Sequence, residues 1–224
     1  MSRMLRLVLF VLGGLVVLLL VMLLAIYVAA RHEPEFYRKA LETKRDVLEK
    51  GSDRMLRKVA ALESAMVKPG HWEIRFTADE INGWLAVDMA KNHPSALPPS
   101  LKNPRVAIGP KELSAACRFE QGDAVSVLSL TIQAYMSEPN VVALRIVRAR
   151  AGLLPLPLGR VLEGLSQAAR DMRFRLEWRR TGGDPVALLA PADDGDARWI
   201  VRIETVRLDE GEIYVAGTTK RAKR

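Results

Sequence analysis

The chain begins with a long run of apolar residues. Residues 7–30 carry no charged side chain and consist mostly of leucine and valine. As a helix rising 1.5 Å per residue, this run would be about 36 Å long, more than the roughly 30 Å hydrocarbon core of a bilayer. A cleavable signal peptide, with Arg3 and Arg6 as its basic region, would have an apolar stretch of only about 7–15 residues. We therefore predict an uncleaved transmembrane helix, with the lipid bilayer as its partner through residues 7–30.

Basic residues flank this run on both sides, and they bear on its orientation. Two arginines precede it, whereas five basic residues follow it: Arg31, Arg38, Lys39, Lys44 and Arg45. Because cytoplasmic flanks are enriched in lysine and arginine, this count favours a cytoplasmic C-terminal side. A family resemblance given below favours the opposite orientation.

Apolar side chains then recur at helical spacing along residues 31–70, up to the helix-terminating Pro69-Gly70. This pattern predicts a long amphipathic stalk helix, which packs either on its own domain or on a second copy of the chain. A coiled coil would place Arg45 and Ser52 at core positions, where they make a poor seam. A homodimer through the stalk helix therefore stays an open alternative.

Beyond the stalk, the pattern predicts a mixed domain. Thr77 to Glu80 has the spacing of a capping box before a short helix. Apolar and polar residues then alternate with a period of two, which predicts antiparallel strands that include 124–137 and 141–150. A further amphipathic helix is predicted over 158–171.

The predicted fold class is therefore α+β, with an N-terminal transmembrane helix, a long stalk helix and a curved antiparallel sheet that wraps one or two helices. The corresponding segments are the tail and anchor (1–30), the stalk (31–70), the α+β domain (71–217) and a basic tail (218–224).

Composition excludes several classes of protein. With 49% hydrophobic and 27% charged residues, the chain is not intrinsically disordered. The single cysteine, Cys117, excludes an intramolecular disulfide framework and a cysteine-based zinc site. The sequence contains no glycine-rich phosphate loop, nucleophile elbow or H-E-x-x-H motif, and its three histidines are not spaced for a metal. We therefore predict no enzymatic activity, no cofactor and no metal site.

The chain has a net charge of +8, and many of its arginines lie in the predicted strands. These side chains either form a solvated sheet face or contact anionic lipid headgroups. The predicted headgroup-facing patch consists of Arg145, Arg148, Arg173, Arg175, Arg198 and Arg202. Aromatic residues alternate with the arginines onto the opposite face, so they form no stacking platform, and we predict no nucleic-acid partner.

Two short motifs resemble the YpmS-like extracytoplasmic membrane-anchored family. Residues 76–82 contain threonine-x-x-glutamate-isoleucine-asparagine, and residues 152–157 read Gly-Leu-Leu-Pro-Leu-Pro before a predicted helix. The resemblance spans roughly residues 70–180. Because that family is similar in outline to tubular lipid-binding domains, the resemblance implies a domain outside the cytoplasm, at the cell membrane, with an apolar ligand. The charged segment 31–70 and the arginine content depart from the family pattern.

We therefore expect a single-pass, membrane-anchored, non-enzymatic protein that binds a lipid or another apolar ligand in a groove of its sheet. The predicted lining consists of Leu128, Leu130, Ile132 and Trp178. The same side chains would equally fill an ordinary core. The alternative function is a membrane-tethered scaffold that acts through its stalk helix and its arginine-rich face.

Overall fold

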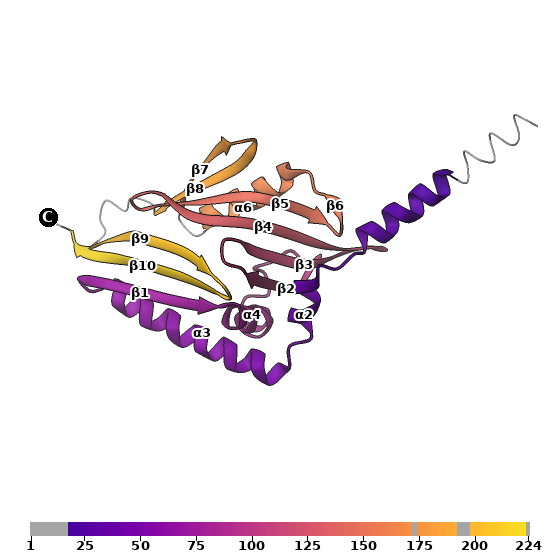
Figure 1. Ribbon diagram of the computed structural model, residues 1–224. Helices are drawn as coiled ribbons and strands as arrows, with labels where there is room; N and C mark the ends of the chain where they lie inside the picture. Colours follow the sequence, from indigo (N-terminus) through magenta and orange to yellow (C-terminus); the bar gives the residue numbers. More distant parts are fainter. Residues whose placement is uncertain (1–17, 172–173, 192–197, 223–224) are drawn as a thin grey trace, which may run out of the picture.

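Two antiparallel sheets make up most of the molecule (Figure 1). The computed structural model describes residues 18–171, 174–191 and 198–222. The smaller sheet has three strands in the order β1-β10-β9, and the larger sheet has seven strands, six of them in the order β2-β3-β4-β5-β8-β7, with β6 paired to β5. The strands are β1 (Gly70–Thr77), β2 (Leu101–Ile108), β3 (Leu113–Gln121), β4 (Ala124–Glu138), β5 (Val141–Ala151), β6 (Leu154–Pro155), β7 (Phe174–Thr181), β8 (Asp184–Pro191), β9 (Trp199–Asp209) and β10 (Glu212–Arg221).

The helices lie around these sheets. A helix at residues 18–30 projects from one end of the larger sheet, and α3 runs along β1 (Figure 1). The remaining helices are short, apart from α6, which lies against β7. Their bounds are α2 (Glu35–Leu41), α3 (Arg45–Met66), α4 (Ala78–Ala86), α5 (Asp88–Asn92) and α6 (Leu158–Asp171).

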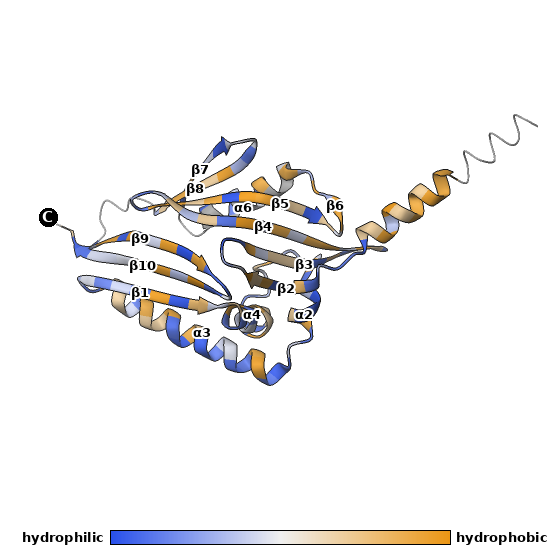
Figure 2. Ribbon diagram, viewed as in Figure 1, coloured by the Kyte–Doolittle hydropathy of each residue, from blue (hydrophilic) through white to orange (hydrophobic). Residues whose placement is uncertain are grey.

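The prediction of a transmembrane helix needs correction. Within the described ranges, no helix is both long enough and apolar enough to cross a membrane. The described part of the predicted span is the helix at 18–30, which at 1.5 Å per residue is about 20 Å long. Residues 1–17 lie outside the described residues. The helix at 18–30 nevertheless exposes almost only apolar side chains (Figure 2), and Leu24 is 62% exposed.

The predicted stalk helix is not seen either. Residues 31–70 form two helices, α2 and α3, and both pack on their own domain. Tyr37 of α2 is fully buried, and its hydroxyl donates to the carbonyl oxygen of Asn103 at 3.0 Å. The buried Arg105 donates its Nε to the carbonyl oxygen of Ala40, so it caps the end of α2.

Glycines allow α3 and α4 to cross at very short distance. A Cβ atom on Gly51 would lie 2.6 Å from the carbonyl oxygen of Asp79, and one on Gly83 would lie 2.5 Å from the backbone nitrogen of Ser52. Ser52 is buried in this crossing. Ser52, which would weaken a coiled-coil seam, therefore lies in an intramolecular contact, and α3 is not a stalk.

The single curved sheet of the prediction is divided into two. The sheets are joined at the β4–β5 turn, where Asn140 has a left-handed φ of 67°. Its backbone N–H donates to the carbonyl oxygen of Ile203 at 3.2 Å, and its side-chain oxygen accepts from the N–H of Ile203 at 2.9 Å. A second link runs from the N–H of Gly211 to the carbonyl oxygen of Ile108. Asn140 therefore links the two sheets through one backbone and one side-chain hydrogen bond to Ile203.

The predicted basic tail also needs correction. Residues 218–221 belong to β10, where they pair with β9 and, through Thr218 and Thr219, with β1. Thr219 is buried, so this stretch is part of the fold. Residues 223–224 lie outside the described residues.

Candidate ligand-binding site

The register of β3 and β4 places the predicted groove residues on one face of the larger sheet. Leu128 pairs with Cys117, Leu130 with Ala115 and Ile132 with Leu113. Directly paired residues of neighbouring strands project to the same face of a sheet, and alternate residues of one strand do so too. The three leucine and isoleucine side chains therefore share a face with apolar partners on β3.

A β-bulge continues this face onto β5. The register of β4 and β5 shifts between Thr131 and Ile132, which leaves Val147 as an extra residue on β5. Apolar residues of β5 therefore stay on one face on both sides of the bulge, and its arginines stay on the other. The pairs on the apolar side are Leu130 with Ala149, Ile132 with Ile146 and Ala134 with Leu144.

Trp178 joins the same face from two strands away. Leu144 of β5 pairs with Ala187 of β8, which in turn pairs with Trp178 of β7. The indole N–H of Trp178 donates to the hydroxyl oxygen of Ser166 at 2.9 Å, so α6 covers the β7 end of this face. The apolar face, as named below, consists of Leu113, Ala115, Cys117, Leu128, Leu130, Ile132, Ala134, Leu144, Ile146, Ala149, Trp178 and Ala187.

The fully buried core of the larger sheet includes clusters on the opposite face. Val127 of β4 is 2% exposed and packs with Tyr37, and Ala143 of β5 is fully buried against Val186. Ile146, Ala149 and Ala187 of the apolar face are buried as well, whereas the four predicted groove residues are half-buried. Burial raises the pKa of the Cys117 thiol on the apolar face, so this side chain is uncharged at neutral pH. The arrangement suits an uncharged, apolar molecule.

The five predicted headgroup arginines that the structure describes are divided between the larger sheet and the region of β9. Arg145, Arg148 and Arg175 lie on the larger sheet, opposite the apolar face. Arg145 pairs with Asp184 at 2.6 Å, and Arg148 pairs with Glu112 at 3.2 Å. Arg202 belongs to β9 of the smaller sheet, Arg198 directly precedes that strand, and Arg173 lies outside the described residues. Their contact with headgroups stays a prediction.

No family model matches this chain. No curated protein and no solved structure is similar enough to count as a match. The resemblance to YpmS-like proteins therefore stays a prediction. In the structure, residues of its first motif support the fold: the side-chain amide of Asn82 donates to the carbonyl oxygen of Val106 and accepts from its N–H.

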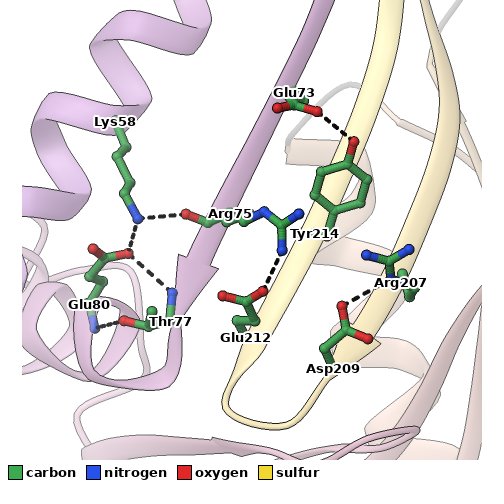
Figure 3. Close-up of polar contacts among 9 residues, drawn as sticks. All are labelled: Lys58, Glu73, Arg75, Thr77, Glu80, Arg207, Asp209, Glu212 and Tyr214. Carbon is green, nitrogen blue, oxygen red and sulfur yellow. Dashed lines mark hydrogen bonds and ion pairs between the residues drawn. The ribbon is translucent and has the colours of Figure 1, made fainter.

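The capping box of the same motif is confirmed, and its glutamate is also the buried centre of an ion cluster (Figure 3). The Glu80 side chain is only 4% exposed, and it accepts from Lys58 at 2.7 Å and from the N–H of Thr77 at 3.1 Å. Arg54 lies 3.4 Å away. Lys58 also donates to the carbonyl oxygen of Arg75, which ties α3 to β1. Sequence spacing predicted the cap but not these cations.

A second polar cluster covers the outer face of the smaller sheet (Figure 3). The guanidinium groups of Arg75 and Arg207 lie 4.8 and 5.1 Å from the ring centroid of Tyr214. The Tyr214 hydroxyl donates to Glu73 at 2.7 Å, and this hydrogen bond raises the pKa of Tyr214. Arg75 also contacts Glu212, and Arg207 contacts Asp209. Each guanidinium already has a carboxylate partner, so the cluster stabilises the sheet surface.

In the described part of the chain, no group of three or more histidine, cysteine, aspartate or glutamate side chains could hold a metal ion. The apolar face is the candidate ligand-binding site, because its apolar side chains run continuously across the larger sheet.

Replacing Glu80 with glutamine should destabilise the protein in a pH-dependent manner. Burial alone would raise the pKa of Glu80, but hydrogen bonds from Lys58 and Thr77 and the charge of Arg54 outweigh burial and lower it. The stability that the carboxylate adds is therefore present above the unfolded pKa of about 4.3 and is lost as the pH falls through the folded pKa. We expect Glu80→Gln to lower the free energy of unfolding by about 1–3 kcal/mol at pH 7.

Urea denaturation at pH 7 and at about pH 3 measures this effect, because the difference between wild type and variant should shrink at the lower pH. Glu49→Gln is the control, since Glu49 pairs with Arg45 on the exposed side of α3 and should cost less than about 0.5 kcal/mol. An equal difference at both pH values would contradict the role given to Glu80.

Proposed function

We propose that this protein binds a lipid, or another apolar molecule, on the apolar face of its larger sheet. The observation that carries the proposal is the continuity of that face. The register aligns apolar side chains from β3, through β4, β5 and β8, to Trp178 on β7. Burying an alkyl chain there would gain about 0.8 kcal/mol for each methylene group removed from water. The half-buried side chains of Leu128, Leu130 and Ile132 would supply part of the contact.

We further propose that the helix at residues 18–30 attaches the protein to a lipid bilayer. Its exposed side chains include Leu18, Leu20 and Leu24, each with more than half of its surface in contact with solvent. Contiguous apolar surface of this kind is typical of membrane or protein contacts. The bilayer is the partner that removes such a surface from water on all sides of the helix.

We place the domain outside the cytoplasm, with the family resemblance as support. Protease added to intact spheroplasts should then degrade residues 31–224. A fully protected domain would reverse this placement.

The scaffold alternative has less support from the structure than the binding of an apolar ligand. It requires a stalk that is free to dimerise, whereas α3 packs against α4 and β1 of its own chain. Arg145 and Arg148 already hold carboxylate partners, which weakens a role for the arginine-rich face in binding an acidic protein.

Photo-crosslinking tests the proposed binding face. A fatty acid that carries a diazirine group would be added to membranes containing the full chain, and the sample would be irradiated. Peptide mass spectrometry would then identify the crosslinked peptides. We expect labelled peptides from β4 and β7, which contain Leu130 and Trp178, in addition to the helix at 18–30. Labels confined to that helix would contradict the binding face and leave only membrane attachment.

A further inference from the structure

The domain holds the C-terminal end of the helix at 18–30. The backbone N–H of Leu153 donates to the carbonyl oxygen of Ala29 at 2.8 Å, and the Ser126 hydroxyl donates to that of Ala30 at 2.6 Å. Gly152 has a φ of 59°, and a Cβ atom there would lie 2.6 Å from the carbonyl oxygen of Ala30. The domain therefore donates hydrogen bonds to carbonyl oxygens at the end of this helix, so helix and domain are docked together.

The segment that makes this contact is itself apolar and exposed. Residues 152–157, named the apolar turn below, contain only glycine, leucine and proline. Leu153 is 50% exposed, and Pro155 and Pro157 are exposed as well. Glycine and proline are common in surface turns, whereas leucine is not, because water solvates such turns. The exposed Leu153 is therefore the feature of this turn that suits an apolar environment.

The contacts also set the level of the apolar turn along the helix. The guanidinium of Arg31 lies 4.3 Å from the ring centroid of Tyr27, and this combination of aromatic and basic residues is typical of the membrane–water interface. Leu153 is hydrogen-bonded to Ala29, which lies midway between those two residues. Because a helix rises 1.5 Å per residue, Leu153 is within about 3 Å of both residues along the helix axis.

We propose that the apolar turn is a second membrane-contact segment, which inserts Leu153 into the interfacial layer of a lipid bilayer beside the helix at 18–30. The inference rests on the proposed attachment of that helix to a bilayer. Two strand pairings connect the apolar turn to the apolar face, because Leu154 pairs with Ala151 and Ala151 pairs with Leu128. Insertion of the turn therefore brings the Leu128 end of the apolar face to the membrane surface.

Environment-sensitive fluorophores at single cysteines test this contact. With Cys117 replaced by alanine, the full chain would carry a nitrobenzoxadiazole probe at Leu153→Cys, Leu24→Cys or Ile200→Cys. Ile200 is the matched control, because it is 56% exposed and pairs with Lys220 at the end of β10 that lies away from the helix at 18–30 in Figure 1. Each variant would be reconstituted into vesicles of phosphatidylcholine and phosphatidylglycerol, with and without nitroxide-labelled lipid.

We expect a blue shift and nitroxide quenching at positions 153 and 24, and neither at position 200. Quenching at position 24 with a solvent-exposed probe at 153 would overturn the membrane contact of the turn and leave the attachment of the helix standing. Solvent-exposed probes at both positions would overturn the attachment and the inference together. Equal quenching at 153 and 200 would also overturn the inference, since contact would then not be specific to the turn.

Discussion

Replacing Gly83 with alanine should lower the free energy of unfolding by about 3 kcal/mol, the upper end of what overpacking usually costs. The added Cβ would lie 2.5 Å from the backbone nitrogen of Ser52 and would also overlap the carbonyl oxygen of Leu48. Both are main-chain atoms of α3, so no side chain can rotate away to relieve the overlap. The helices α3 and α4 would have to separate, which would disturb the buried side chains of Ser52 and Glu80.

Urea denaturation followed by circular dichroism in mild detergent measures this loss. Gly164→Ala in α6 is the control, because nothing lies within 4 Å of a Cβ atom at that position. There, alanine should leave stability unchanged or raise it by up to about 1 kcal/mol, since glycine is a poor helix former. Equal stability of Gly83→Ala and wild type would contradict the close approach of α3 and α4 at Gly83.

Replacing Leu130 with glutamate should reduce binding of an apolar ligand by about tenfold or more, a loss of at least about 1.4 kcal/mol. Leu130 lies near the middle of the apolar face, between Ala115 on β3 and Ala149 on β5. A carboxylate there must either lose its hydration when the ligand binds or keep water on the face, and both outcomes disfavour an alkyl chain. Fluorescence titration with an apolar dye, displaced by fatty acid, gives the affinity.

Ser129→Glu is the matched control on the same strand. Ser129 pairs with Arg150 and projects to the opposite face, so a carboxylate there should leave binding unchanged. Circular dichroism of both variants separates loss of binding from loss of the fold. Equal binding by Leu130→Glu and wild type would contradict the assigned face.

Local patterns predicted several elements of this fold correctly. The helix predicted over 158–171 is α6 with the same bounds, and the strands predicted at 124–137 and 141–150 are β4 and β5 to within one residue. Alternation also marks β1, where Trp72, Ile74 and Phe76 alternate with charged residues, although no strand was predicted there. These signals succeed because the periods of helices and strands depend on neighbouring residues.

The features that sequence patterns missed depend on contacts between distant residues. The helical spacing over residues 31–70 is present in α3, but the residues that join it to α4, such as Gly51 and Asp79, are 28 positions apart in the chain. The shift that keeps Arg145 and Arg148 on one face depends on Val147, an extra residue that becomes visible only when β5 is paired with β4. Alternation predicted that Leu128, Leu130 and Ile132 share a face, whereas the strand order of the sheet was needed to bring Trp178 onto it.

Native mass spectrometry of the full chain, released from its membrane in mild detergent, tests the binding of an apolar ligand most directly. The wild-type protein should retain a population with the added mass of a lipid, and this population should disappear in Leu130→Glu but persist in Ser129→Glu. Fragmentation of the retained species would identify the ligand. A wild-type chain that carries no added mass, under conditions in which the fold survives, would contradict the account.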